Sequence, residues 1–175
     1  MQIRGSRRYL FAMLDVDTRY WIAWQVAEHK GTDDVRPMFR KARDVAGKVP
    51  SKLTSDGAAN FAEAHRAEYA PKNFLRKDSE HESHIYMAGD RNNNQMESFN
   101  GNTVRLREGS TRGLKTDDSA ILSGLHIYHN HVCPHLGLPE HSTPEAAASI
   151  AIRGGNGLKA LIQAAAKAER VKSAD

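Results

Sequence analysis

Two short apolar runs open the chain and predict a pair of strands. Residues 9–16 (YLFAMLDV) end in a turn at Asp15–Arg19, and residues 20–28 (YWIAWQVAE) follow directly. The second run is rich in aromatic and β-branched side chains, which favour strands. We therefore expect the two segments to pair as a hairpin.

The spacing of apolar residues then changes to that of a helix over residues 34–46. Thr32 is predicted to cap this helix, two acidic residues complement its dipole, and Gly47 ends it. Pro37 fits only if it lies in the first turn. The predicted apolar face consists of Val35, Met38, Phe39, Ala42, Val45 and Ala46.

The remaining pattern alternates short strands with helices. A strand at 51–55 breaks at Asp56-Gly57, and an alanine-rich helix follows at 58–69. Residues 72–91 are polar and irregular, with short strands predicted at 74–77 and near His84–Tyr86. Further helices are predicted at 93–107, at 115–131, from Thr143-Pro144-Glu145, and in a fraying tail. This order predicts one α/β domain with a mixed sheet flanked by helices.

Composition narrows the class of protein. The 175 residues are 39% hydrophobic and 26% charged, as in globular domains, and the net charge of +4 mildly favours a polyanionic partner. Cys133 is the single cysteine, which excludes an internal disulfide and fits a reducing compartment. No apolar run approaches the length of a membrane helix, and residues 1–10 lack the apolar core of a signal peptide. We therefore expect a cytoplasmic protein without membrane contact.

Asp56 is the first residue that points to chemistry. It follows a short strand and precedes Gly57, so it lies where the carboxyl end of a strand opens into a loop. In open α/β sheets, ligands bind at that edge. An ordinary Asp-Gly turn between strand and helix explains the same residues.

Glu97 is the second such residue, because it lies among amides and arginines in a stretch suited to anions. If 93–107 is helical, Glu97, Asn100 and Val104 share one face, with Arg105 and Arg107 beside it. Two carboxylates from distant segments can share a hard cation, and nearby basic groups can hold phosphate oxygens. The alternative is a solvated helix with an intrahelical ion pair.

Histidines form the third feature, and their spacing superficially resembles that of zinc ligands. No paired-cysteine motif accompanies them, so phosphate contacts or packing are the favoured roles. The residues concerned are His81, His84, His126, His129, His131 and His135.

Three segments together carry a resemblance to a known family. TSDGAANFAEA, GDRNNNQMESFNGNTVRLREGSTRGLK and YHNHVCPHLGLPEHSTPEAA occur in this order after YLFAMLDVDTR. Over residues 3–152 the chain resembles the insertion-sequence DDE transposases, whose catalytic domain is similar to that of retroviral integrases. The resemblance implies a ribonuclease H-like fold, two divalent metals (Mg²⁺ or Mn²⁺), and cleavage and joining of DNA ends.

The resemblance also implies roles for individual residues. Asp56 matches the second acid of the catalytic triad and Glu97 matches the third, so both are expected metal ligands. Asn94 matches the amide before the glutamate, and Arg105 falls near the basic position after it. Asn94, Arg105 and Arg107 are the expected DNA contacts.

The chain departs from the family pattern at several positions. The first acid of the triad is expected upstream of Met1, because Gly5 matches a glycine that follows it. Asp15 and Asp17 are alternatives, although both match the turn after the second strand. Cys133 and Ser98 stand where the family more often has basic residues, and the separation of Asp56 and Glu97 is slightly longer than usual. A DNA-recognition domain is not apparent in the sequence.

We therefore predict a DDE transposase catalytic core at residues 1–152, lacking the start of its first strand, and a helical tail at 153–175. Transposon ends and target DNA are the expected partners, a homodimer is left open, and the expected location is the nucleoid. The chain alone is expected to be inactive. A non-catalytic transposon remnant that binds DNA and a metal-independent interaction module are the competing interpretations.

Overall fold

The chain divides into two compact units in a computed structural model. One contains Met1–Leu14 and Trp21–Leu122, and the other contains Asp15–Tyr20 and Ser123–Asp175. The predicted boundary after residue 152 is a different division and stays a prediction. The residues that the structure describes are 2–3, 6–70, 79–83, 94–101, 116, 120–150, 159, 162, 163 and 166.

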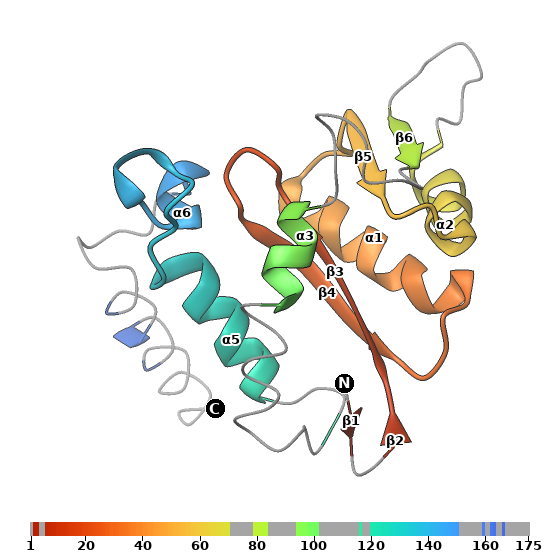
Figure 1. Cartoon of the computed structure of the whole chain (residues 1–175), viewed down its shortest axis with the longest axis horizontal. Helices are drawn as coiled ribbons and strands as arrows, with labels where there is room; N and C mark the ends of the chain where they lie inside the picture. The colour runs from red at the N-terminus through yellow and green to blue at the C-terminus, as the bar shows by residue number, and fades with distance from the viewer. Residues whose placement is uncertain are drawn as a thin grey trace, which may run out of the picture. The chain divides into compact units, whose positions relative to one another are not determined.

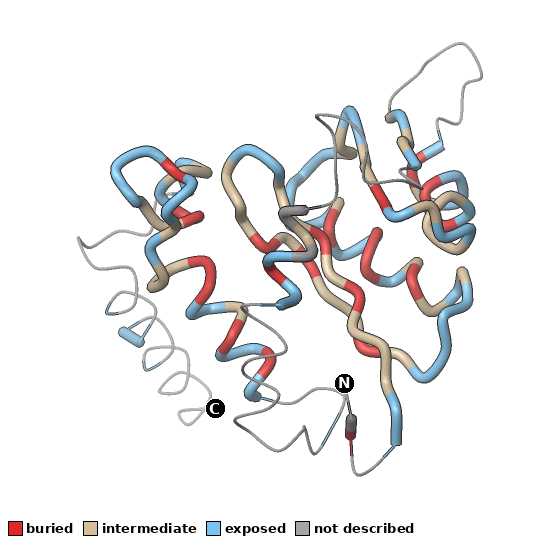
Figure 2. Tube along the Cα trace, viewed as in Figure 1, coloured by how far each residue is buried: buried red, intermediate tan, exposed pale blue. Residues whose placement is uncertain are grey.

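The predicted hairpin is confirmed. Strand β3 (Tyr9–Leu14) pairs antiparallel with β4 (Trp21–Ala27), and a bulge at Ile22 shifts the register between Met13 and Leu14. Buried positions alternate with half-buried ones along β3, as a strand that faces a core requires (Figure 2). Two shorter strands, β1 (Gln2–Ile3) and β2 (Ser6–Arg7), form a second antiparallel pair.

Helix α1 (Thr32–Ala46) is also confirmed, with changes at its ends and inside it. Gly31 occupies the cap position, and Thr32 is the first helical residue. The Gly31 N–H donates a hydrogen bond to the Asp34 carboxylate at 2.8 Å. Pro37 lies inside the helix, beyond the first turn. Gly47 ends the helix as predicted, in a left-handed conformation (φ 67°) that costs glycine little.

The predicted apolar face of α1 is shorter than the sequence indicates. Val35, Met38, Phe39 and Ala42 are buried, whereas Val45 is 54% exposed. The buried residues pack against β3, β4 and helix α2 (Ala59–Tyr69) in one hydrophobic cluster (Figure 1). The cluster ends before the last turn of α1, and this leaves Val45 in solvent.

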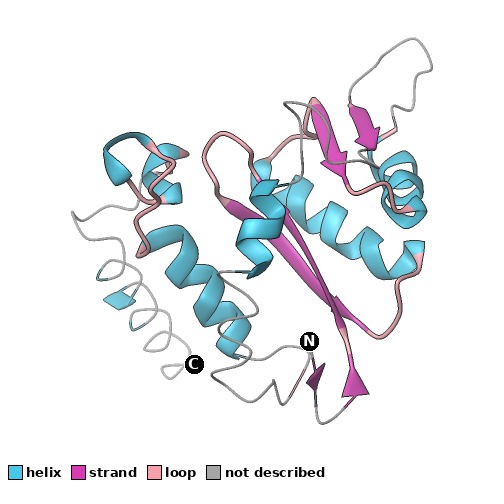
Figure 3. Ribbon diagram, in the orientation of Figure 1, coloured by secondary structure: helices cyan, strands magenta, loops and turns pink. Residues whose placement is uncertain are grey.

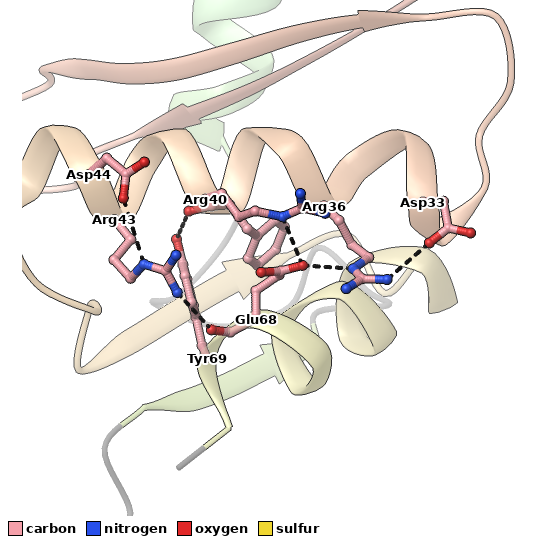
Figure 4. A network of polar contacts seen from close by, with 8 residues as sticks. Asp33, Arg36, Arg40, Arg43, Asp44, Glu68 and Tyr69 are labelled. Carbon is pink, nitrogen blue, oxygen red and sulfur yellow. Dashed lines mark hydrogen bonds and ion pairs between the residues drawn. The ribbon is translucent and has the colours of Figure 1, made fainter. Parts of the chain in front are cut away.

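Polar contacts join α1 to α2 at the edge of this cluster (Figure 4). Glu68 Oε1 accepts hydrogen bonds from Arg36 Nε (2.7 Å) and Arg40 Nε (3.1 Å). Burial alone would raise the pKa of Glu68, but these hydrogen bonds and the two positive charges lower it overall. The Tyr69 hydroxyl donates to the Phe39 carbonyl at 2.7 Å, which satisfies a polar group inside the core.

The strand expected at 51–55 forms as β5 (Lys52–Ser55), but its partner differs from the prediction. It pairs parallel with β6 (Glu80–Ser83), so the described strands form three two-stranded sheets and not one (Figure 3). Leu53 still packs against the cluster around Phe39. Strand β5 therefore joins the core through side chains, without a described backbone ladder to the hairpin. The α/β class is confirmed, and the ribonuclease H-like arrangement stays a proposal.

The second half of the chain is mainly helical where the structure describes it. Helices α3 (Asn94–Phe99) and α5 (Ala120–His131) lie within the ranges predicted for them. A short 3₁₀ turn, η2 (Pro139–His141), precedes α6 (Pro144–Ala147), which Thr143 caps as predicted. The strands predicted at 74–77 and 84–86 lie outside the described residues. None of the described helices is both long and apolar enough to cross a membrane.

Candidate functional site

Asp56 lies at the carboxyl end of β5, as the sequence predicts. The side chain is exposed, and its Oδ1 accepts a hydrogen bond from the Ala58 N–H at 3.2 Å. This bond ties the turn to the start of α2. Within the described part of the chain, Oδ2 has no hydrogen-bond partner. One carboxylate oxygen is therefore held by a hydrogen bond, and the other remains available to a ligand.

A contact between buried Ser55 and half-buried His81 supports the turn. Ser55 is 6% exposed, and its hydroxyl lies 3.0 Å from His81 Nε2 on β6. The Gly57 N–H also reaches Ser55 Oγ, at 3.5 Å. Gly57 has φ 87°, a conformation that other residues rarely adopt. The backbone on both sides of Asp56 is therefore fixed by hydrogen bonds and by glycine.

His65 on α2 extends this support. Its Nε2 lies 2.8 Å from Ser79 Oγ, and its ring centroid lies 5.4 Å from that of His81. Burial, and then the charge of His81, lower the pKa of His65; burial lowers the pKa of His81. Both rings are therefore neutral at pH 7, and each has a serine as its polar partner. His65 and His81 therefore have a structural role. Their proximity across α2 and β6 could not be predicted from the sequence.

Helix α3 carries Asn94 and Glu97, and it is anchored by its last residue. The ring of Phe99 meets Trp21 edge to face with centroids 4.8 Å apart, and both side chains are buried. This contact fixes the helix backbone against the start of β4. The side chains of Asn94 and Glu97 lie outside the description, and so do Arg105 and Arg107 altogether. Convergence of Glu97 with Asp56 stays a prediction.

The Asp15 carboxylate forms more hydrogen bonds within its own turn than the Asp56 carboxylate does. Its Oδ1 accepts two hydrogen bonds from Thr18, one from the N–H (2.8 Å) and one from the hydroxyl (2.7 Å). Its backbone also bonds Arg19 and Tyr20, which closes the hairpin turn. Asp17 lies exposed in the same turn. The geometry favours a turn-forming role for Asp15 over a catalytic one.

The histidines of the second unit make separate contacts. His131 Nδ1 lies 2.7 Å from Glu145 Oε2, and this pair joins the end of α5 to the start of α6. His129 Nε2 bonds the Arg19 carbonyl at 2.9 Å, and His126 bonds Asn130 at 3.2 Å. Across the described residues, no group of three or more His, Cys, Asp or Glu side chains could hold a metal ion. Nothing described therefore favours a zinc site.

Comparison with known protein families identifies a domain in this chain. A family model described as a DDE domain matches residues 1–133 of the 175. No curated protein and no solved structure matches the chain. The matched range includes both strand β5 with Asp56 and helix α3 with Glu97.

Proposed function

The chain belongs to the insertion-sequence DDE transposases, because the model of their DDE domain matches residues 1–133, and from this premise we propose that it serves DNA strand cleavage and transfer in transposition. Asp56 and Glu97 are the proposed carboxylates of the site. The observation that carries the proposal is the state of Asp56. It is an exposed carboxylate at a strand end, in a turn held by hydrogen bonds, with one oxygen to which no described residue donates a hydrogen bond.

The donor set suits Mg²⁺ or Mn²⁺. Carboxylate oxygen is the ligand that these hard cations prefer, and Asp56 offers one on a fixed backbone. When bound, two such ions would activate water, and later a DNA 3′-hydroxyl, for in-line attack on a phosphodiester. The protein's part is to hold the carboxylates in place, and the bonds of Ser55 to His81 and Gly57 serve this purpose.

A third carboxylate is the weak point of the proposed site. The sequence has no acidic residue before Asp15, and Asp15 Oδ1 already accepts two hydrogen bonds from Thr18. We therefore propose that residues 1–175 alone hold the metals poorly and cleave DNA slowly. The alternative function is that of a transposon remnant that binds DNA without cutting it.

DNA is the proposed partner. Asn94, Arg105 and Arg107 are proposed to contact phosphate oxygens, which would give binding with little sequence preference and a strong dependence on salt. Association with the nucleoid follows from such binding. A homodimer remains open as a further proposal, since cutting two transposon ends calls for two sites.

A metal-binding and nicking experiment tests the proposal. The purified chain is titrated with Mn²⁺ and then incubated with supercoiled plasmid and Mg²⁺ or Mn²⁺. Asp56→Asn and Glu97→Gln should each weaken Mn²⁺ binding at least tenfold and remove any residual nicking. Glu63→Gln, which neutralises an exposed carboxylate on α2, is the matched control and should change neither.

The outcomes separate the alternatives. DNA binding without metal binding or nicking supports the remnant. A chain that binds neither DNA nor metal would be an interaction module, and the transposase proposal would fail. Metal-dependent nicking that Asp15→Asn or Asp17→Asn abolishes would identify the first acid within the hairpin turn.

A further inference from the structure

Arg19 has a fixed and strained backbone in the hairpin turn. Its φ is 61°, in the left-handed region that disfavours residues with a Cβ. Its N–H donates to the Asp15 carbonyl at 3.0 Å, and its carbonyl is bound by His129 Nε2 at 2.9 Å. Hydrogen bonds therefore occupy both the N–H and the carbonyl of Arg19, and they fix the position of its Cα.

One nitrogen of the Arg19 guanidinium, Nη1, is buried without a hydrogen-bond acceptor among the described residues. No described carboxylate forms an ion pair with it: Asp15 Oδ1 is bound to Thr18, and Glu145 is bound to His131. A buried guanidinium N–H without an acceptor is costly, so such groups are normally paired.

Asp15 and Asp17 lie in the same turn as Arg19, but among the described residues neither forms an ion pair with it. His135 lies near enough that, after burial, the positive charge of Arg19 lowers its pKa. The ring centroids of His129 and His135 are 5.8 Å apart, and the pKa of His129 is lowered by burial first. Both imidazoles are held neutral beside a permanent cation. Arg19 and His135 are half-buried as whole residues, whereas Nη1 itself is buried, so a ligand would meet it only after a rotation of the guanidinium.

We propose that Arg19 and His135 form a binding site for one phosphate group, and that its occupant is a backbone phosphodiester of DNA. The guanidinium supplies the charge and a planar fork of donors that matches phosphate oxygens. Neutral His135 supplies one further N–H donor. A bound phosphate would give Nη1 its missing acceptor once the guanidinium turns toward the ligand. The inference rests on the proposed function for its choice of DNA, but its residues differ from those of the carboxylate site.

The first test compares two variants that lose the same charge. Arg19→Gln and Arg66→Gln each remove one arginine, but Arg66 is an exposed residue of α2 in the other unit. The probe is a 20-base-pair duplex of mixed sequence, titrated at several salt concentrations. Arg19→Gln should weaken binding several-fold and reduce the slope of log K against log salt by about 0.9, the loss of one phosphate contact. Arg66→Gln should leave the slope unchanged, and equal effects of the two variants would overturn the proposal.

A second test needs no variant. The ring signals of His135 are followed by NMR through a pH titration of the wild-type chain, alone, with the duplex, and with inorganic phosphate. A phosphodiester beside the ring favours the imidazolium, so the duplex should raise the pKa of His135. If only inorganic phosphate raises it, the site takes small anions and the DNA assignment is wrong. If neither does, no anion site exists.

The two proposals can fail separately. A chain that binds DNA with an unchanged pKa of His135 retains the proposed function and loses this site. A chain that binds no DNA, but whose His135 responds to inorganic phosphate, retains an anion site and loses the proposed function. Arg19→Lys, which keeps the charge and removes the fork, should bind DNA with intermediate affinity.

Discussion

Phe99→Ala should uncouple helix α3 from the rest of its unit. The helix has six residues, too few to be stable alone, because short isolated helices do not recover the cost of nucleation. Its helical state therefore depends on docking. The edge-to-face contact of Phe99 with Trp21, at 4.8 Å between centroids, is the described anchor of that docking.

The size of the effect follows from the burial of the ring. Phe99 is 5% exposed and Trp21 is fully buried, so truncation leaves a cavity beside the indole. Replacement of a core phenylalanine by alanine costs about 3–5 kcal/mol, of which the aromatic pair contributes about 0.5–1.5 kcal/mol. We expect a loss of about 3 kcal/mol, at the lower end, because α3 is short and can move into the space.

Urea unfolding followed by fluorescence, with amide hydrogen exchange, measures both parts of this prediction. Phe99→Ala should lower the free energy of unfolding and remove exchange protection from α3, while protection of β3 and β4 persists. Phe99→Leu should cost less than half as much. Leu136→Ala, at a side chain that is 85% exposed, should cost under about 0.5 kcal/mol. An unchanged free energy of unfolding, or a protected α3 in Phe99→Ala, would refute the anchoring role.

Three further predictions concern titrating groups. Burial raises the pKa of Tyr69 to about 12, so its protonated form contributes stability that is complete below pH 10 and is lost as pH rises toward 12. The loss, up to about 3 kcal/mol, should be absent from Tyr69→Phe in alkaline unfolding titrations. The pKa values of His65 and His81 are lowered, so the stability that their neutral forms contribute should be complete above pH 6.5 and should fall as acid protonates them. NMR titrations that place both pKa values at or above 6.5 would contradict this prediction. The pKa of Glu68 is also lowered, so its contribution to stability is present above about pH 4.5 and is lost below it. Glu68→Gln should lower Tm at pH 7 and flatten that acid transition. An unchanged Tm would show that the hydrogen bonds of Arg36 and Arg40 to Glu68 do not stabilise the fold.

Local signals in the sequence located most elements. The hairpin, the glycine end of α1, and the Thr143 cap each depend on a few adjacent residues, and all three are confirmed. Prediction was wrong at Thr32, where Gly31 and Asp34 cap the helix instead. It was also wrong at Val45, because the periodic pattern continues past the point where β3, β4 and α2 stop covering α1.

Pairings between distant residues could not be predicted in the same way. The parallel pairing of β5 with β6 joins segments separated by the whole of α2, and it replaced the single sheet that strand order indicated. The contacts of His65 with Ser79 and of Ser55 with His81 depend on that pairing. No spacing rule indicates that Arg19 lies near His135, because the two residues are 116 positions apart in the sequence (135 − 19 = 116).

The two aspartate turns differ in the number of hydrogen bonds that each carboxylate accepts. Both Asp15 and Asp56 follow a strand and accept a hydrogen bond from a backbone N–H within three residues. Thr18 adds a hydroxyl donor to the same oxygen of Asp15, whereas the turn after Asp56 continues with Gly57 and Ala58, which have no side-chain donor. A carboxylate with two short hydrogen bonds loses part of its capacity to bind a cation, because those donors compete for the same lone pairs. Asp56 keeps that capacity, and the absence of a donor side chain after it supports the proposal that Asp56, and not Asp15, binds a metal ion.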